Sequence, residues 1–266
     1  MNSIETEVVV VGGGPGGYAA AFYAADHGKK VLLIERDPRL GGVCLNRGCI
    51  PSKALLYATH MITESRESAK RGITFQEPTI DLSKLRDWKE SILDKLGQGI
   101  AGLAKRRGVE TIQGKAYFED GQSLRVETDK GQQFVKFEQA IIAVGSHSAL
   151  PKAFDLGNKR IMTSRGALQL EDIPERLLVV GGGYIGMEMG TVYAGLGSKV
   201  VMVEAMDGIL MGADPDLVKP VAAKVASTFE EVRVKAKVTK MATQGKQILV
   251  EMEHEGKTLK DRKSVV

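Results

Sequence analysis

A strand–glycine–helix–strand pattern occurs twice in this chain of 266 residues, and the second copy begins 169 residues after the first. In each copy an apolar run of four residues, 8–11 or 177–180, leads directly into the spacing G-x-G-x-x-G. A helix-length segment, a glycine and a second apolar run follow, and that run ends in an acidic residue. Because every part of a βαβ unit is present twice and in order, the sequence predicts an α/β protein with two Rossmann-like dinucleotide-binding domains, one after the other.

The glycines of the two motifs have distinct expected roles. The first of each motif allows a sharp turn, the second lets the backbone approach a pyrophosphate, and the third lets the helix pack against the strand. The N–H groups at the start of the helix then face the phosphates. These roles fall, in order, on Gly12, Gly14 and Gly17 in the first copy and on Gly181, Gly183 and Gly186 in the second. The alternative is that both motifs are glycine-rich turns without a ligand.

The acidic residues that end the second strands are Glu35 and Glu204. A carboxylate at this place accepts hydrogen bonds from ribose hydroxyls. Since a carboxylate repels a 2′-phosphate, Glu204 favours NAD over NADP. Two dinucleotide sites in one chain need two different ligands. The first copy ends only nine residues before Cys44, so a flavin held there could exchange electrons with that thiol, and the second copy would hold the nicotinamide.

The only two cysteines, Cys44 and Cys49, lie in one short segment between glycines and a proline. Residues five apart in a regular helix are roughly 8 Å apart between Cα atoms, too far for a disulfide, so we expect irregular backbone between them. Pro51 is expected at the first position of a following helix. That places Cys49 beside a helix N-terminus, where the dipole favours a thiolate. The alternative is a pair of inert thiols.

Composition and charge exclude several classes of protein. Residues 1–7 carry two glutamates and no basic run, so no secretory signal is expected, and the stretch 8–25 contains too many glycines for a membrane span. The net charge of +4 is modest, and Lys105-Arg106-Arg107 is expected to be a solvated helix end rather than a nucleic-acid site. The four histidines show no zinc-ligand spacing, so no metal is expected. The sequence predicts a cytoplasmic protein.

The segment Gly41–Leu56, taken with the two glycine motifs, resembles the pyridine-nucleotide–disulfide oxidoreductases. Within that family, Cys-Leu-Asn-x-Gly-Cys-Ile-Pro-Ser-Lys-Ala-Leu-Leu resembles the dihydrolipoamide dehydrogenases more than the glutathione or mercuric reductases, and glutathione reductase has a lysine in place of Ser52. The resemblance runs from about Thr6 to about Asp261. It implies FAD in the first domain, NAD in the second and oxidation of protein-bound dihydrolipoamide.

The resemblance also implies roles for single residues. Cys44 would attack the substrate, and Cys49 would be the thiol next to the flavin. Lys53 and Glu188 match the family's ion pair beside the reactive flavin nitrogen, although either could be an ordinary surface charge. Tyr184 matches a ring over the flavin, with core packing as the alternative. The remaining expected cofactor contacts are Gly42, Ala116 and Ser146 for FAD and Val238 for the adenine of NAD.

The connecting segments have a coarser pattern. Residues 82–107 are expected to form a long amphipathic helix whose apolar stripe is buried. Residues 109–145 are expected to form strands with turns at 120–121 and 130–131. The predicted stripe is Leu85, Trp88, Ile92, Leu96, Ile100 and Leu103. The domain boundaries are predicted at 1–146 for the FAD domain and 147–266 for the NAD domain.

Members of the resembled family continue for almost as long again beyond the segment matched here. That further part carries a second flavin contact and a dimer-interface domain with a His–Glu base. The tail 261–266 is expected to stop where an apolar strand should begin, leaving the NAD domain incomplete and the dimer-interface domain absent. The chain would then be a fragment, a truncated product or an early-ended gene model, poorly soluble, weak in FAD retention and nearly inactive.

The partners implied by the resemblance are lipoyl domains of 2-oxoacid dehydrogenase or glycine cleavage complexes, with a homodimer in the full-length family. No nucleic acid and no membrane span are expected. Two alternatives stay open: an inactive FAD- or NAD-binding module, and another disulfide reductase of the same family.

Overall fold

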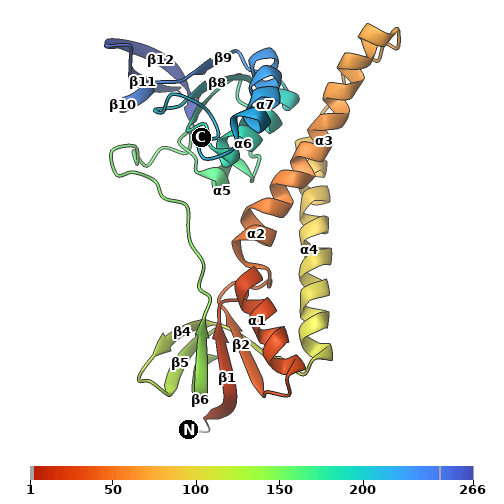
Figure 1. Ribbon diagram of the computed structural model, residues 1–266, viewed down its shortest axis with the longest axis vertical. Coiled ribbons are helices and arrows are strands. Elements are labelled where there is room, and N and C mark those ends of the chain that lie inside the picture. The colour runs from red at the N-terminus through yellow and green to blue at the C-terminus, as the bar shows by residue number, and fades with distance from the viewer. Residues whose placement is uncertain (1–2, 246, 266) are drawn as a thin grey trace. The chain divides into compact units, whose positions relative to one another are not determined.

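The computed structural model describes residues 3–245 and 247–265, and the chain divides into two compact units (Figure 1). Unit 1 comprises Met1–Pro51 and Lys89–His147, and unit 2 comprises Ser52–Trp88 and Ser148–Val266. Each unit contains one six-stranded mixed sheet. The predicted α/β fold with two dinucleotide-binding units is therefore confirmed.

Unit 1 is built on a sheet in the order β3-β2-β1-β6-β5-β4. Strands β1, β2, β3 and β6 pair in parallel, and β4 and β5 extend the sheet as antiparallel strands. The central strand β1 is buried because it lies between two parallel neighbours, with Val9 and Val10 fully buried. The strands are β1 (Ile4–Val11), β2 (Val31–Glu35), β3 (Glu110–Gln113), β4 (Lys115–Phe118), β5 (Ser123–Thr128) and β6 (Gly131–Ile142). The predicted strands and both predicted turns of this region are present.

The helices that begin in this part of the chain are α1 (Pro15–Asp26), α2 (Gly42–Arg47), α3 (Cys49–Ser68) and α4 (Leu82–Arg106), with a 3₁₀ turn, η1 (Ala69–Arg71), after α3. Helix α1 connects β1 to β2 and packs Ala21 against the core, which completes the predicted βαβ unit. The predicted long helix over 82–107 is confirmed as α4. Its buried face differs from the predicted stripe.

The buried residues of α4 are Lys89, Leu93, Gly97 and Ala104, whereas Trp88 and Leu96 of the predicted stripe are exposed. The physical reason is close packing at Gly97, where an added Cβ would lie 2.5 Å from Cγ of Arg39. The helix approaches its neighbours along its small residues, which a hydrophobicity pattern does not mark.

Unit 2 repeats the sheet of unit 1. Its order is β10-β11-β12-β7-β8-β9, so β7, β8, β9 and β12 take the places of β1, β2, β3 and β6. The strands are β7 (Arg176–Val180), β8 (Lys199–Val203), β9 (Glu231–Arg233), β10 (Ala236–Gln244), β11 (Gln247–His254) and β12 (Lys257–Val265). The helices are α5 (Ser164–Ala167), α6 (Tyr184–Leu196) and α7 (Pro215–Thr228). The duplication seen in the glycine motifs thus extends to the whole sheet.

Strand β12 corrects the expectation for the tail. The segment expected to stop before a strand belongs to β12, and Ser264 and Val265 pair in parallel with Leu177 and Leu178 of β7. The reason is the shared topology, since β12 lies beside β7 as β6 lies beside β1.

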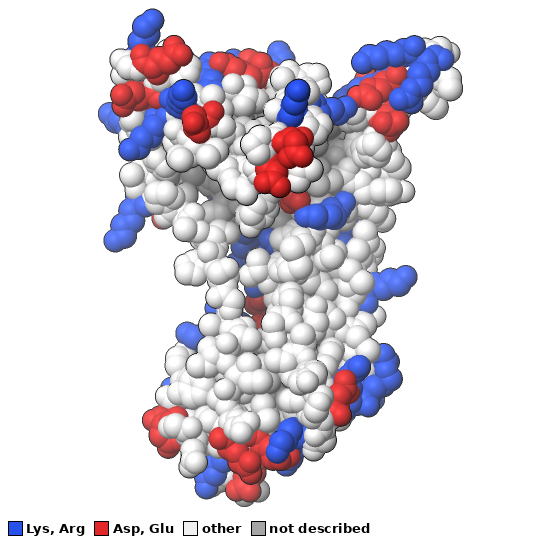
Figure 2. Space-filling view, in the orientation of Figure 1, with Lys and Arg blue, Asp and Glu red and all other residues white. Residues whose placement is uncertain are grey.

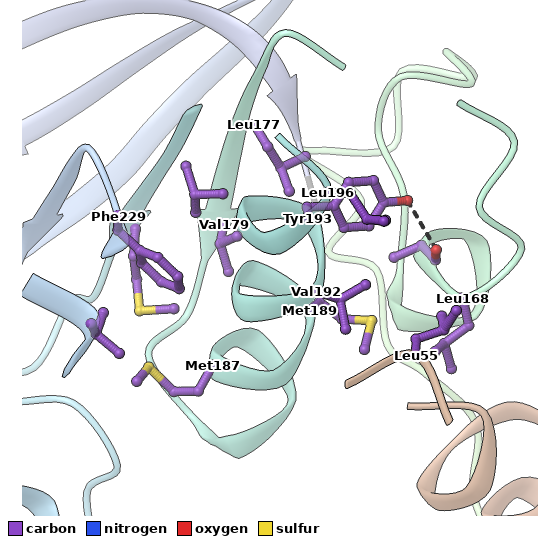
Figure 3. Close-up of a cluster of buried hydrophobic side chains, with 14 of the residues drawn as sticks. Leu55, Leu168, Leu177, Val179, Met187, Met189, Val192, Tyr193, Leu196 and Phe229 are labelled. Carbon is purple, nitrogen blue, oxygen red and sulfur yellow. Dashed lines mark hydrogen bonds between the residues drawn. The ribbon is translucent and has the colours of Figure 1, made fainter. Parts of the chain in front are cut away.

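The segment Ser52–Trp88, expected in the first domain, belongs to unit 2. Leu55 is fully buried in a cluster with residues of α6 (Figure 3). Leu82 and Leu85 pack against the same cluster. Arg86 also donates a hydrogen bond to the carbonyl of Leu170 at 2.8 Å. Apolar burial therefore assigns most of α3 and the start of α4 to the second unit.

Charged side chains are spread over the surface. On the face shown in Figure 2, basic and acidic side chains are interspersed over both ends of the view. Among the described residues, no helix combines the length and apolar content needed to cross a membrane.

Candidate active site

The first glycine loop in unit 1 requires glycine at two positions. Gly12 has a φ of +106°, and an added Cβ would lie 2.2 Å from the carbonyl oxygen of Ala143. At Gly17 an added Cβ would lie 1.7 Å from the carbonyl oxygen of Gly12. The predicted turn and the predicted close helix–strand packing are both present.

Unit 2 repeats this geometry. Gly181 has a φ of +111°, and a Cβ at Gly186 would lie 2.1 Å from the carbonyl oxygen of Gly181. Helices α1 and α6 begin after N-cap glycines, Gly14 and Gly183, neither of which provides a side-chain cap. Each loop thus presents the start of a helix of at least twelve residues, a geometry suited to an anionic phosphate.

A cavity of about 460 Å³ in unit 1 opens at this loop. Its walls include six of the eight residues predicted to contact FAD, together with one of the two cysteines. These are Gly12, Gly14, Glu35, Gly42, Ala116, Ser146 and Cys44. Gly17 does not line the cavity because it packs against the turn, and Lys53 belongs to unit 2.

Backbone approaches backbone closely in the wall of this cavity. A Cβ at Gly42 would lie 2.6 Å from Cα of Gly14, so both positions keep a narrow wall free of side chains. A bare backbone wall, an uncapped helix start and a carboxylate at the end of β2 are the features that a dinucleotide needs. The residues present therefore fit such a group.

Glu35 and Glu204 also accept hydrogen bonds from backbone N–H groups, which the sequence did not predict. Glu35 Oε2 accepts a hydrogen bond from the Gly13 N–H at 2.7 Å, and Glu204 Oε2 accepts one from the Gly182 N–H at 2.6 Å. Their Oε1 atoms accept from the N–H groups of Asp37 and Met206, at 2.9 and 2.8 Å. Each carboxylate therefore fixes its own glycine loop, and it has lone pairs left for a ribose hydroxyl.

A charged pair in the cavity wall was not predicted from sequence. Arg47 of α2 forms an ion pair with Asp37, and both side chains are half-buried. The pair ties the helix that carries Cys44 to the loop after β2. No local spacing marks two charges ten residues apart as partners, so the sequence held no signal for it.

The cysteine segment consists of two helices separated by one residue. Helix α2 includes Cys44 and ends at Arg47, and α3 begins at Cys49. The expected irregular stretch is thus confined to Gly48, with φ −147° and ψ −105°. Pro51 is the third residue of α3 rather than the first, because a proline is tolerated throughout the first helical turn.

The two cysteines differ in exposure. Cys49, at the start of α3, is exposed, and Cys44 is half-buried. The disulfide bridge between the two side chains stays a prediction. The order of exposure is the reverse of that expected if Cys44 is the outward thiol, so the division of roles also stays a prediction.

In unit 2, α3 and α6 bring three polar side chains together. Lys53 Nζ lies 2.5 Å from Glu188 Oε1, and Ser52 Oγ donates to Glu188 Oε2 at 2.8 Å. The predicted ion pair is therefore formed between residues 135 positions apart, which argues against two unrelated surface charges. Ser52 was not among the predicted site residues.

A second cavity, of about 450 Å³, lies at the glycine loop of unit 2. Gly181, Gly183, Tyr184 and Gly186 line it. Tyr184 is 71% exposed, which excludes core packing as its role. Val238, expected to contact the adenine, is 7% exposed and packs in a core cluster with Leu178 and Val201, because it faces inward from β10.

Within the described part of the chain, no group of three or more His, Cys, Asp or Glu side chains is arranged to hold a metal ion.

Comparison with known proteins gives one consistent family. The family model described as pyridine nucleotide-disulphide oxidoreductase matches residues 6–266. The dihydrolipoyl dehydrogenase of Haemophilus influenzae is 44% identical over 261 residues, which is 98% of this chain and 54% of the relative. That of Geobacillus stearothermophilus is 46% identical over 215 residues, 81% of this chain and 45% of the relative. The chain spans about half the length of the curated relatives it matches.

Two solved structures share the fold. LpdA from Mycobacterium tuberculosis superposes with a TM-score of 0.85 at 26% identity, covering 98% of this chain and 57% of LpdA. The HOCl-induced flavoprotein disulfide reductase RclA from Escherichia coli, as its Cu(II) complex, has a TM-score of 0.82 at 26% identity, with 100% and 56% coverage.

Proposed function

Because this chain belongs to the pyridine nucleotide-disulphide oxidoreductase family, we propose that it is the FAD- and NAD-binding part of a dihydrolipoyl dehydrogenase. The reaction is oxidation of protein-bound dihydrolipoamide to lipoamide, with NAD as the final acceptor. The observation that carries the proposal is the place of Cys44 in the wall of the cavity that also contains the first glycine loop and Glu35. A thiol and a dinucleotide site share one cavity.

The thiol chemistry is a two-step exchange at the cysteine pair in its disulfide form. A thiolate of the substrate attacks Sγ of Cys44, the Cys44–Cys49 bond breaks, and its electron pair leaves on Cys49 as a thiolate. The second thiol of the substrate then attacks the sulfur bonded to Cys44, which closes the product disulfide and releases Cys44. A base takes the proton, the substrate has lost two electrons, and the cysteine pair has gained them.

The start of α3 stabilises this charge. Cys49 is the first residue of a 20-residue helix, where the helix dipole favours an anion. When bound, FAD supplies a two-electron carrier between the cysteine pair and NAD. The chain's own contribution is to hold the phosphates on glycine loops, the ribose at Glu35 or Glu204, and a fixed positive charge at Lys53.

The preference for NAD is assigned to Glu204. Its carboxylate is anchored by the N–H groups of Gly182 and Met206, so it cannot swing away from a 2′-phosphate without breaking both hydrogen bonds. Repulsion between the two anions then disfavours NADP.

The proposed setting is cytoplasmic, with lipoyl domains of 2-oxoacid dehydrogenase or glycine cleavage complexes as partners and a homodimer as the assembly. Support comes from the curated relatives named dihydrolipoyl dehydrogenase.

A second candidate is another disulfide reductase of the same family, favoured by the structural match to RclA. The test is anaerobic reduction of the chain, saturated with FAD, by dihydrolipoamide or by reduced glutathione. Dihydrolipoamide should produce the long-wavelength charge-transfer band of a reduced cysteine pair beside oxidised flavin far faster, and subsequent addition of NAD should remove the band while forming NADH. Equal or faster formation of the band with glutathione would favour the second candidate, and no spectral change with either thiol would leave only a binding module.

A further inference from the structure

The side chain of Ser52 is buried at the point where α3 meets the carboxylate of Glu188. Ser52 is 1% exposed, and its hydroxyl donates to Glu188 Oε2 at 2.8 Å. The other oxygen of the carboxylate, Oε1, accepts from Lys53 Nζ at 2.5 Å. Two consecutive residues of one helix therefore hold the two oxygens of one carboxylate on another.

The two contacts differ in how firmly they can hold Glu188. The side chain of Lys53 is 60% exposed, so its ion pair is screened by solvent and pays for ordering a long side chain. The Ser52 hydroxyl is itself buried, and it donates to a carboxylate, one of the stronger kinds of acceptor for a hydrogen bond. Serine also has one side-chain torsion to order, whereas lysine has four.

Ser52 itself is held in place by the packing of α3 on α6. One turn further along α3, Leu55 is 1% exposed and packs in the cluster that includes Met189 and Val192 (Figure 3). Thr59, one turn further along α3, lies close to Gly195 of α6. A Cβ added at Gly195 would be 2.7 Å from Cβ of Thr59. The spacing 52, 55 and 59 is one face of a helix, so Ser52 is the first member of a buried seam.

We infer that Ser52 is a positioning residue of the redox site. Its hydroxyl fixes the carboxylate of Glu188, and the fixed carboxylate in turn holds the Lys53 ammonium in one place. Without the hydroxyl, Glu188 can rotate about its side-chain torsions, and the ammonium follows it. The inference rests on the proposed function only for the consequence, namely that the Lys53–Glu188 pair serves the exchange of a hydride with the nicotinamide.

Three variants separate positioning from packing. Ser52→Ala removes the hydroxyl and little else, and Ser52→Thr restores a hydroxyl at the same atom. Thr59→Val is the matched control, because it removes a buried hydroxyl from the same seam, one that donates to the carbonyls of Leu55 and Leu56 and does not reach Glu188.

The first measurement needs no cofactor. The full chain is acetylated with acetic anhydride and then digested, and mass spectrometry gives the acetylation rate of Lys53. That rate reports how firmly the Lys53 ammonium is held. Ser52→Ala should raise the rate at Lys53 severalfold relative to other lysines, and Ser52→Thr and Thr59→Val should leave it unchanged. An unchanged rate in Ser52→Ala, or an equal rise in Thr59→Val, would overturn the inference.

The second measurement uses the chain saturated with FAD. Bleaching of the flavin by NADH should be slower in Ser52→Ala by roughly tenfold, the effect of one charge-assisted hydrogen bond, and normal in the other two variants. Normal bleaching in Ser52→Ala would contradict a role in the redox site. If NADH does not bleach the unmutated chain, the proposed function fails, and the acetylation rates still decide whether Ser52 positions the pair.

Discussion

Tyr193 on α6 has a buried hydroxyl group whose pKa is raised by its surroundings. It is 1% exposed, and its hydroxyl donates to the carbonyl of Ala167 at 2.9 Å, as the dashed line in Figure 3 shows. Burial raises the pKa of Tyr193 to about 12, with Asp172 and Glu171 adding to the rise through their negative charges. The phenol is therefore held neutral where an unfolded chain would ionise it.

This shift predicts a loss of stability in alkali. The folded pKa is raised, so the contribution is complete below the unfolded value near 10 and is lost as the pH rises through about 12. The rise of the Tyr193 pKa from 10.0 to about 12 corresponds to a loss on the order of 2–3 kcal/mol. Urea unfolding between pH 9 and about 12 should show a fall in the free energy of unfolding that is absent in Tyr193→Phe. Equal pH dependence in both chains would show that another group is responsible.

Glu204 is expected to set the preference for NAD over NADP, and this role can be separated from its hydrogen bonds to the backbone. Glu204→Gln removes the negative charge and keeps an oxygen for the Gly182 N–H, so NADP should bind closer to NAD in affinity. Glu204→Ala should also weaken NAD by roughly tenfold or more, because it leaves two N–H groups without their acceptor. Calorimetric titration with both nucleotides measures this. The assignment is wrong if the unmutated chain binds NADP as tightly as NAD.

The roles of the two cysteines can be decided by alkylation. The family resemblance assigns the outward, substrate-attacking role to Cys44, whereas Cys49 is the more exposed thiol in the structure. After mild reduction of the chain saturated with FAD, iodoacetamide should label Cys44 first, with mass spectrometry as the readout. Much faster labelling of Cys49 would reverse the assignment.

At the scale of single residues, the sequence predicted those whose role is local. Gly12, Gly17 and their partners in the second copy are determined by backbone geometry within one turn, and a short motif records that geometry. Ser52 and Arg47 act through partners, Glu188 and Asp37, that only the fold brings near. A single sequence has no pattern for such contacts.

At the scale of elements, α1 shows how one glycine differs from its neighbour. Gly16 and Gly17 both lie in its first turn, but a Cβ at Gly16 would meet nothing within 4 Å, whereas one at Gly17 would lie 1.7 Å from the carbonyl oxygen of Gly12. The same helix thus supplies a substitution and its control.

Gly17→Ala should destabilise the chain by about 1–3 kcal/mol, because β1 and α1 must move apart to admit the methyl group. Gly16→Ala should be neutral or stabilise by up to about 1 kcal/mol, since alanine loses less backbone entropy in a helix. Urea unfolding of both variants without cofactor gives the comparison. If Gly17→Ala is as stable as Gly16→Ala, the close packing at the loop is not as described.

The presence of a helix or strand was easier to predict than which of its faces is buried. Helix α4 was predicted within one residue at its end, because its length and periodicity are strong signals. Two residues of its predicted buried stripe, Trp88 and Leu96, are exposed, and the helix packs through Gly97 and Ala104 instead. Strand β12 was missed because its polar sequence carries no strand alternation, and its place is set by the parallel strand β7 beside it.

At the scale of the whole molecule, the repeated motif predicted two units but not their composition. The chain leaves the first unit near Pro51 and returns at Lys89, because the intervening segment buries Leu55 and its neighbours against α6. Two units with the same strand order support the proposal that one unit holds a flavin beside the cysteine pair and the other holds the nicotinamide.

The most direct test of that claim is the visible spectrum of the chain saturated with FAD, in three forms. Mild reduction of the unmutated chain should produce a long-wavelength charge-transfer band between a Cys49 thiolate and the flavin. Cys44→Ser should show the band without reduction, because Cys49 can no longer be held in a disulfide, and Cys49→Ser should never show it. A band that persists in Cys49→Ser, or no band in Cys44→Ser with FAD bound, would contradict an electron path between this cysteine pair and the flavin.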